Sequence, residues 1–192
     1  MSFGTVVTRG LVGGLFMGHG AQKLWGRLGG HGLEGTGQFF EGTLGLSPGR
    51  KHAQAAGLAE FGGGALLAAG ALTPVASTLI SSTMITAIRK VHAPKGPWVT
   101  DGGWEYNAVL IAVATLLADR GPGSPSVDGA LLPNFKGTKW AVLSLAAAAA
   151  GSFLATSEKF PPAPVEQALD ALDADARFTR DDVAAEAPSS AS

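Results

Sequence analysis

The chain of 192 residues is 46% hydrophobic and only 15% charged, with 28 glycines and a net charge of −1. A soluble domain usually has about 25% charged residues, so this composition indicates a membrane protein. The near-neutral charge argues against a nucleic-acid partner. The absence of cysteine excludes disulfides, thiolate nucleophiles and cysteine-ligated zinc or iron–sulfur centres within this chain.

Five apolar segments predict an all-α, integral membrane protein. A membrane-spanning helix needs about 17–25 residues; the first three segments reach this length and the last two are shorter. We expect an antiparallel four-helix bundle from residues 1–131, then a loop and a fifth short membrane helix within 132–156. The first segment lacks a basic n-region, so we interpret it as a retained span and not as a signal peptide. The segments cover residues 3–24, 53–72, 74–91, 104–118 and 140–155.

The connections between the segments support a bundle. Pro74 follows Thr73 directly, and proline suits the first turn of a helix, so the second and third segments should form a hairpin. Residues 36–46 predict a short interfacial helix with apolar side chains toward lipid, namely Phe39, Phe40 and Leu44. Tryptophans lie at the ends of segments, as in an aromatic belt: Trp25, Trp98, Trp104 and Trp140.

Glycines predict where helices pack closely. They recur every fourth residue in the first segment, at Gly10, Gly14 and Gly18, and share a face of the second at Gly57 and Gly64. In membranes such small-residue faces let helix backbones approach each other. We therefore predict a packing seam along these glycines, which also leaves a homo-oligomer open.

Lysine and arginine set the expected orientation. They are more frequent in the connections after the first and third segments than on the opposite side, which predicts that these two connections are cytoplasmic. The N-terminus would then lie outside. We expect a multi-pass protein of a bacterial-type cytoplasmic (inner) membrane.

The last part of the chain has a different character. Residues 157–192 are acidic and rich in proline and alanine, with almost no large apolar side chains. Such a segment cannot bury enough apolar surface to fold. It therefore predicts a disordered, solvated tail.

Ionisable residues inside or at the ends of apolar segments are the candidate functional groups, because burying them in a membrane is costly. Glu60 lies inside the second segment and is the sharpest case. In an antiparallel bundle the end of one segment meets the start of the next, so the polar residues there can converge on the cytoplasmic face. The candidate cluster is His19, Lys23, Glu60, Arg89, His92, Glu105 and Asn107.

This cluster suits several tasks. It could bind a polar head group such as a quinone ring, or relay protons, since histidine and buried glutamate titrate near neutrality. It could also be a structural clasp between helices. No pair has an HxxxH or ExxH spacing, so no metal site is predicted, and quinone is the candidate ligand with no covalent cofactor.

The order of short motifs along the chain resembles the DoxX family. The motifs are HGAQKL from residue 19, GLAEFGGG from 57, LTP from 72, VHAPKG from 91, GGWEYN from 102 and GPG from 121. The resemblance covers residues 3–131 and implies a four-helix membrane bundle. It also implies a link to the DoxD subunit of thiosulfate:quinone oxidoreductase, and to membrane partners of sulfurtransferases and superoxide dismutase. It defines no catalytic residues, and residues 132–192 lie outside it.

Three functions follow from these observations. The first is a membrane subunit of an oxidoreductase or oxidative-stress complex, which contacts the lipid bilayer and other membrane or soluble redox proteins. If it is an enzyme at all, it would be a quinone-linked oxidoreductase subunit that is not catalytic alone. The second is a non-enzymatic scaffold or assembly protein that anchors soluble partners, and the third is a small-solute carrier.

Overall fold

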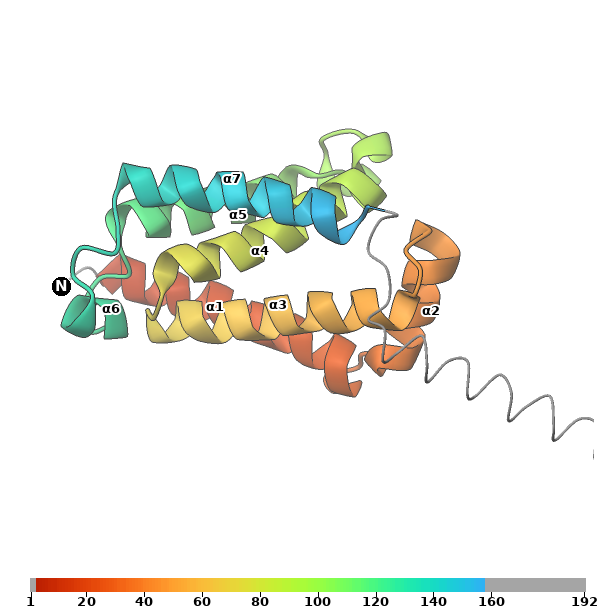
Figure 1. The fold of residues 1–192 in the computed structure, drawn as a ribbon, viewed down its shortest axis with the longest axis horizontal. Coiled ribbons are helices and arrows are strands. Elements are labelled where there is room, and N and C mark those ends of the chain that lie inside the picture. Colours follow the sequence, from red (N-terminus) through yellow and green to blue (C-terminus); the bar gives the residue numbers. More distant parts are fainter. Residues whose placement is uncertain (1–2, 158–192) are drawn as a thin grey trace, which may run out of the picture. The chain divides into compact units, whose positions relative to one another are not determined.

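The computed structural model describes residues 3–157, which form helices and no β-strand. The predicted all-α class is confirmed for this part of the chain. The predicted tail lies, apart from Ser157, outside the described residues. Five long helices pack together (Figure 1): α1 (Phe3–Trp25), α3 (Gly49–Ala69), α4 (Thr73–Ala87), α5 (Glu105–Arg120) and α7 (Thr138–Ala155).

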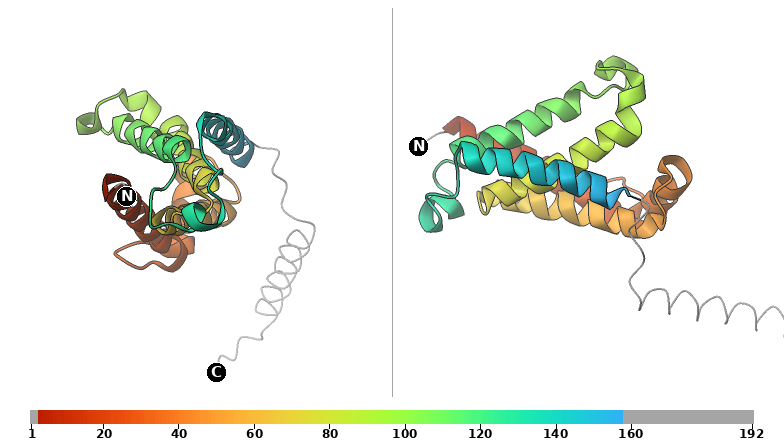
Figure 2. Two further views of the ribbon diagram at one scale, coloured as in Figure 1. Left: turned by 90° about the vertical axis from the view of Figure 1, so that its left-hand side faces the viewer. Right: turned by 45° about the horizontal axis from the view of Figure 1, so that its top comes forward.

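The long helices fall into two groups. α1 and α3 form an antiparallel pair, and α4 leaves α3 through a hairpin and packs against α5 and α7 (Figures 1 and 2). The short helix α2 (Gly32–Leu44) lies at one end and α6 (Val127–Leu131) at the other. At the α2 end, α4 continues through a π-helical turn, η1 (Ile88–His92), and two 3₁₀ turns, η2 (Ala93–Lys95) and η3 (Val99–Asp101).

The apolar segment 140–155 belongs to the bundle and is not an appendage. α7 contacts both α4 and α5. Its buried face consists of small residues at helical spacing, Ala141, Ser144, Ala148 and Ser152. Ser144 donates a hydrogen bond to the Pro74 carbonyl at 2.8 Å, and Thr86 donates to the Ser152 hydroxyl at 2.8 Å. Small side chains and hydroxyl contacts of this kind are typical of helix packing in lipid.

Within residues 3–157, α7 is the one helix that is long and apolar enough to cross a membrane by length and composition. α4 and α5 contain only 15 and 16 residues. At about 1.5 Å per residue, each falls short of the roughly 30 Å hydrocarbon core. Multiple crossings therefore remain a prediction.

Glycines bring α1 and α3 into close backbone contact. A Cβ atom on Gly13 would lie 2.5 Å from the Gly64 carbonyl oxygen, and one on Gly20 would lie 2.5 Å from the Phe61 amide nitrogen. On α3, a Cβ on Gly57 would lie 2.8 Å from the Leu24 side chain. Only glycine permits this backbone approach.

The predicted seam is therefore half wrong. Gly57 and Gly64 lie in the α1–α3 contact, whereas nothing lies within 4 Å of a Cβ on Gly10 or Gly14. Gly18 meets only the tip of Leu28, at 3.6 Å. α1 has two rows of glycines on different faces, and the row that contacts α3 contains Gly13 and Gly20.

Two buried charged residues fasten the α6 end. Arg9 donates hydrogen bonds to the Ala68 carbonyl at the C-terminal end of α3 and to the Pro125 carbonyl, where a cation is favoured by the helix dipole. Asp128, only 2% exposed, accepts hydrogen bonds at 2.7 Å from the Leu72 amide and from both the amide and hydroxyl of Thr73. Its carboxylate thus caps the start of α4.

At the opposite end, Glu41 fastens α2 to α3. Its carboxylate accepts a hydrogen bond from the Gly49 amide at 3.0 Å and one from the Ser47 hydroxyl at 2.9 Å. The bond from Gly49, followed by that from Ser47, lowers the pKa of Glu41 below its usual 4.5. Glu41 is therefore a charged cap on the first turn of α3.

Alanine at position 13 should destabilise the protein, whereas alanine at position 14 should not. Overpacking of this kind costs about 1–3 kcal/mol, while alanine in an open helical position gains up to about 1 kcal/mol over glycine. Unfolding by SDS titration of Gly13→Ala and Gly14→Ala measures both. Equal stabilities would contradict the assigned contact face.

Replacing Asp128 with Asn should lower the free energy of unfolding by about 1–3 kcal/mol, because an amide cannot accept all three bonds and its N–H₂ would face other donors. The matched variant is Asp101→Asn, at an exposed position in η3, which should change little. The same SDS titration compares the two variants. An Asp128→Asn variant with an unchanged free energy of unfolding would show that the cap does not stabilise α4.

The Glu41 cap should make stability depend on pH. A carboxyl group whose pKa is lowered in the folded state stabilises the fold fully above its unfolded pKa, and this contribution is lost as pH falls through the lower folded pKa. The difference in SDS unfolding midpoint between the wild type and Glu41→Gln should therefore be constant above about pH 5.5 and vanish at lower pH. A difference that persists unchanged at pH 2–3 would refute the cap.

Candidate functional site

A cavity of about 490 Å³ lies among the helices at the α2 end. Its walls come from the C-terminal half of α1, the N-terminal half of α3, the end of α4 with η1, and the start of α5. Side chains of α2 and the end of α7 complete it. The lining is mostly apolar, with large side chains that include Phe16, Phe40, Leu44, Met84 and Leu110.

The cavity follows from the hairpin and from small side chains. α3 and α4 pack tightly next to their hairpin, where a Cβ on Gly63 would lie 3.1 Å from Leu79, and they diverge toward the α2 end (Figure 2). The α3 wall of the cavity presents Ala55, Ala56 and Ala59. These side chains are too small to fill the space that the divergence opens.

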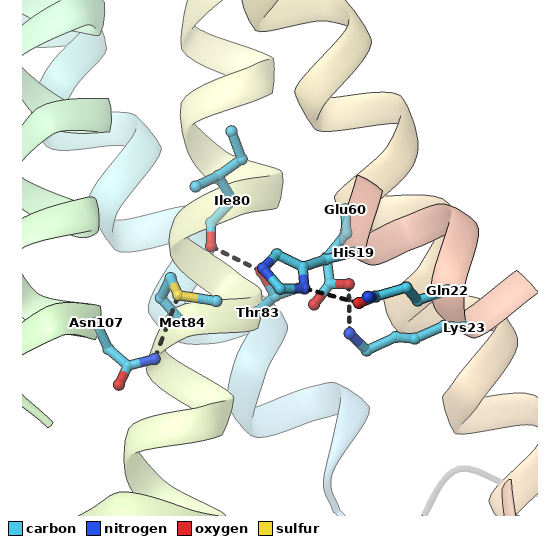
Figure 3. Close-up of polar contacts among 8 residues, drawn as sticks. All are labelled: His19, Gln22, Lys23, Glu60, Ile80, Thr83, Met84 and Asn107. Atoms are coloured by element: carbon cyan, nitrogen blue, oxygen red, sulfur yellow. Dashed lines mark hydrogen bonds and ion pairs between the residues drawn. The ribbon is translucent and has the colours of Figure 1, made fainter. Parts of the chain in front are cut away.

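An ion pair between α1 and α3 lies in the wall of the cavity. Lys23 Nζ is 2.6 Å from Glu60 Oε2 (Figure 3), and Glu60 is only 6% exposed. Lys23 reaches this position because Gly57 has no side chain. The Cβ of Lys23 lies 3.3 Å from the point where a Cβ on Gly57 would be. Breaking such a pair by removing one charge leaves the other poorly solvated.

Two of the histidines that line the cavity, His19 and His92, are each held through Nδ1. His19 Nδ1 lies 3.0 Å from Gln22 Oε1, and Gln22 donates through Nε2 to the Leu28 carbonyl at 3.0 Å. His92 Nδ1 lies 2.7 Å from the Gly102 carbonyl oxygen. Both Nε2 atoms are left without a partner among the described residues.

Asn107 and Thr83 come from the wall formed by α5 and α4. Asn107 is buried and donates through Nδ2 to Met84 Sδ at 3.3 Å. The Thr83 hydroxyl donates to the Ile80 carbonyl at 2.8 Å. Figure 3 shows Asn107 and Met84 on one side and Lys23 and Glu60 on the other.

The structure brings together most of the predicted cluster but not all of it. His19, Lys23, Glu60, His92 and Asn107 all line the one cavity, whereas Arg89 and Glu105 do not. Arg89 instead contacts α7, and Glu105 contacts the turn before α5. The sequence placed them correctly at this end of the bundle, but not on the face that lines the cavity.

Arg89 fastens α4 to α7. It donates to Ser152 at 3.0 Å and Thr156 at 3.2 Å, and its guanidinium carbon is 3.6 Å from the centre of the Phe153 ring. This is a cation–π contact. Glu105 accepts a hydrogen bond from the Val99 amide at 2.8 Å and so orders the turn before α5.

The interfacial helix also differs from its prediction. Phe39, Phe40 and Leu44 line the mouth of the cavity, and the expectation that all three face lipid is wrong. Phe39 nevertheless remains 47% exposed. The amphipathic pattern identified the apolar face of α2, but not that α3 folds back beneath it.

Three further residues in the cavity wall were not predicted: His52, Lys90 and Tyr106. His52 precedes Ala56 and Glu60 at intervals of four residues, so helical spacing from Glu60 could have indicated it. Lys90 could not have been separated from Arg89 by sequence, because the π-helical turn at η1 changes which residue faces inward. Within residues 3–157, no three His, Asp or Glu side chains are grouped to hold a metal ion.

The arrangement can bind a molecule with an apolar body and a polar head. Aromatic and aliphatic side chains offer contact area, while the ion pair and the two histidines are polar groups at fixed positions. Most ligand sites have this composition, with volumes of about 300–1,000 Å³. The buried carboxylate and the imidazoles are also groups that can exchange protons.

Comparison with known proteins covers part of this site. Residues 4–93 match the family model DoxX, a range that includes His19, Lys23, Glu60 and His92 but ends before Asn107. The motifs from residue 102 onward lie outside the match. No curated protein and no solved structure is detectably similar to the chain. Residues 4–93 of the chain are therefore similar to the DoxX family, a family of membrane-associated proteins.

Proposed function

We propose that this protein is a membrane subunit of an oxidoreductase or oxidative-stress complex, and that its cavity binds the head group of a quinone. The observation that carries the proposal is the cavity at the α2 end, which combines an apolar lining with the Lys23–Glu60 pair and two fixed histidines. A quinone has the matching form, with a flat apolar ring, two polar oxygens and an apolar tail.

The polar groups suit a ligand that exchanges protons on reduction. Glu60 is paired with Lys23, and the pair is linked to solvent because Lys23 remains partly exposed, at 23% of its side chain. Histidine and carboxylate side chains are the commonest proton carriers in proteins. Electrons would come from a redox partner, since the chain contains no cysteine and no motif for a covalent cofactor.

The proposal places the chain across a cytoplasmic membrane in several passes. Large apolar side chains are exposed along the outer faces of α1, α5 and α7: Val7, Leu11, Val109, Leu116, Val142 and Phe153. Such faces suit contact with lipid tails. Lys23, Lys90 and the basic residues near them favour a cytoplasmic position for the cavity end, where a quinone head group could meet a soluble partner.

The experiment is a measurement of bound quinone. The intact protein is purified in mild detergent, and quinone is extracted and quantified by mass spectrometry. We expect near-stoichiometric quinone in the wild type and a loss of about 10–100-fold in affinity in Glu60→Gln, as for a hydrogen bond to a charged group.

The matched control is Glu34→Gln, which removes an exposed carboxylate of α2 away from the cavity and should retain quinone. Background quinone in a well-folded wild type would contradict the proposal and favour the non-enzymatic scaffold. Equal loss in both variants would show that binding depends on net charge and not on the ion pair.

A further inference from the structure

Four polar side chains of the cavity wall each use a hydrogen-bond donor inside the protein. They are His19, Thr83, His92 and Asn107. Each donates an N–H or O–H to another protein atom. Each therefore leaves an acceptor for a ligand, and Asn107 also keeps its second N–H.

The histidine tautomers follow from their partners. The Gly102 carbonyl can only accept, so His92 Nδ1 must carry the proton in that bond. Gln22 donates through Nε2 to a carbonyl, which identifies Oε1 as the acceptor for His19 Nδ1. In the neutral ring with Nδ1 protonated, Nε2 is a lone-pair acceptor.

Asn107 and Thr83 lead to the same result. The Asn107 amide donates one N–H to a thioether sulfur, an atom that can only accept, so the orientation of the amide leaves its carbonyl oxygen and its second N–H for a ligand. The Thr83 hydroxyl donates to the Ile80 carbonyl, so its oxygen can only accept from a ligand. Glu60 adds a further acceptor, because Lys23 contacts Oε2 and leaves Oε1.

The remaining donors in this wall belong to Lys23, His52, Lys90, Tyr106 and the second N–H of Asn107. Lys23 directs its ammonium toward Glu60 at 2.6 Å. Lys90 and Tyr106 lie on long, partly or fully exposed side chains that no contact fixes in place. The acceptors, by contrast, are held by short hydrogen bonds on rigid helices, and fixed groups select a ligand at lower entropic cost.

We infer that the cavity binds a hydroquinone, whose two hydroxyl groups donate, in preference to the corresponding quinone, whose two carbonyls only accept. This inference rests on the proposed quinone site and names the redox form that the site selects. A quinone would make no hydrogen bond to the two imidazole nitrogens, and it would leave the oxygen of the buried Asn107 without a partner, which is the costly arrangement for a buried polar group.

The preference has a redox consequence. A quinone takes up two electrons, here from a redox partner, and two protons from solvent to become the hydroquinone. A site that binds the hydroquinone tenfold more tightly raises the midpoint potential of the bound pair by about 30 mV. The bound quinone would thus be a better electron acceptor than free quinone in the membrane.

The test compares two probes that differ only in redox form: a benzoquinone carrying a decyl chain, and its hydroquinone kept reduced under argon. Each is titrated calorimetrically into the full chain in detergent. We expect the hydroquinone to bind at least about tenfold more tightly, as for one or two additional hydrogen bonds.

Variants identify the acceptors. In His92→Asn and His19→Asn the amide can still donate as Nδ1–H does, but the Nε2 acceptor is lost. Each should weaken hydroquinone binding about tenfold more than it weakens quinone binding. His31→Asn, at an exposed position outside the cavity, is the matched control and should change neither.

The outcomes separate the two proposals. Equal affinities for both probes, or tighter quinone binding, would overturn the preference for hydroquinone while the quinone site stands. Variants whose affinity for both probes falls equally would also overturn it, because the histidines would then contribute to the shape of the cavity and not as hydrogen-bond acceptors. Binding of neither probe by well-folded protein would overturn the quinone site and this inference with it.

Discussion

The close approach of α1 to α3 is the constraint on which the rest of the structure depends. Glycines at the contact remove the side chains that would hold the two backbones apart, and Gly13 meets Gly64 backbone to backbone. Only at this separation can Lys23 reach Glu60 at 2.6 Å. The buried carboxylate is tolerable because it is paired, so glycine packing and the charged site form one unit.

The two ends of the bundle serve different purposes. At the α6 end, Arg9 and Asp128 satisfy the free carbonyls of α3 and the free amides of α4, as buried helix ends require. This fixes the hairpin from which α3 and α4 diverge. At the other end the α3 wall of the divergence presents small side chains, and α2 covers the resulting space. The closed end thus sets the geometry of the cavity at the opposite end.

Sequence patterns predicted the helices, the hairpin at Pro74 and the end of the bundle where polar residues gather. They could not decide which face of a helix is used when two faces look alike, as with Gly14 and Gly13. They also could not anticipate the π-helical turn, which directs Arg89 to α7 while His92 lines the cavity. Both failures concern rotation about a helix axis, which depends on tertiary packing and not on local spacing.

The most direct test of the account is whether a quinone-type ligand occupies this cavity. Because the chain has no cysteine, a single Ala56→Cys in the cavity wall can be labelled with a maleimide, beside Thr100→Cys in the exposed η3 turn. We expect decyl hydroquinone at about ten times its Kd to slow labelling at position 56 by about tenfold and to leave the labelling rate at position 100 unchanged. Saturating ligand that slows neither position, or both equally, would contradict it.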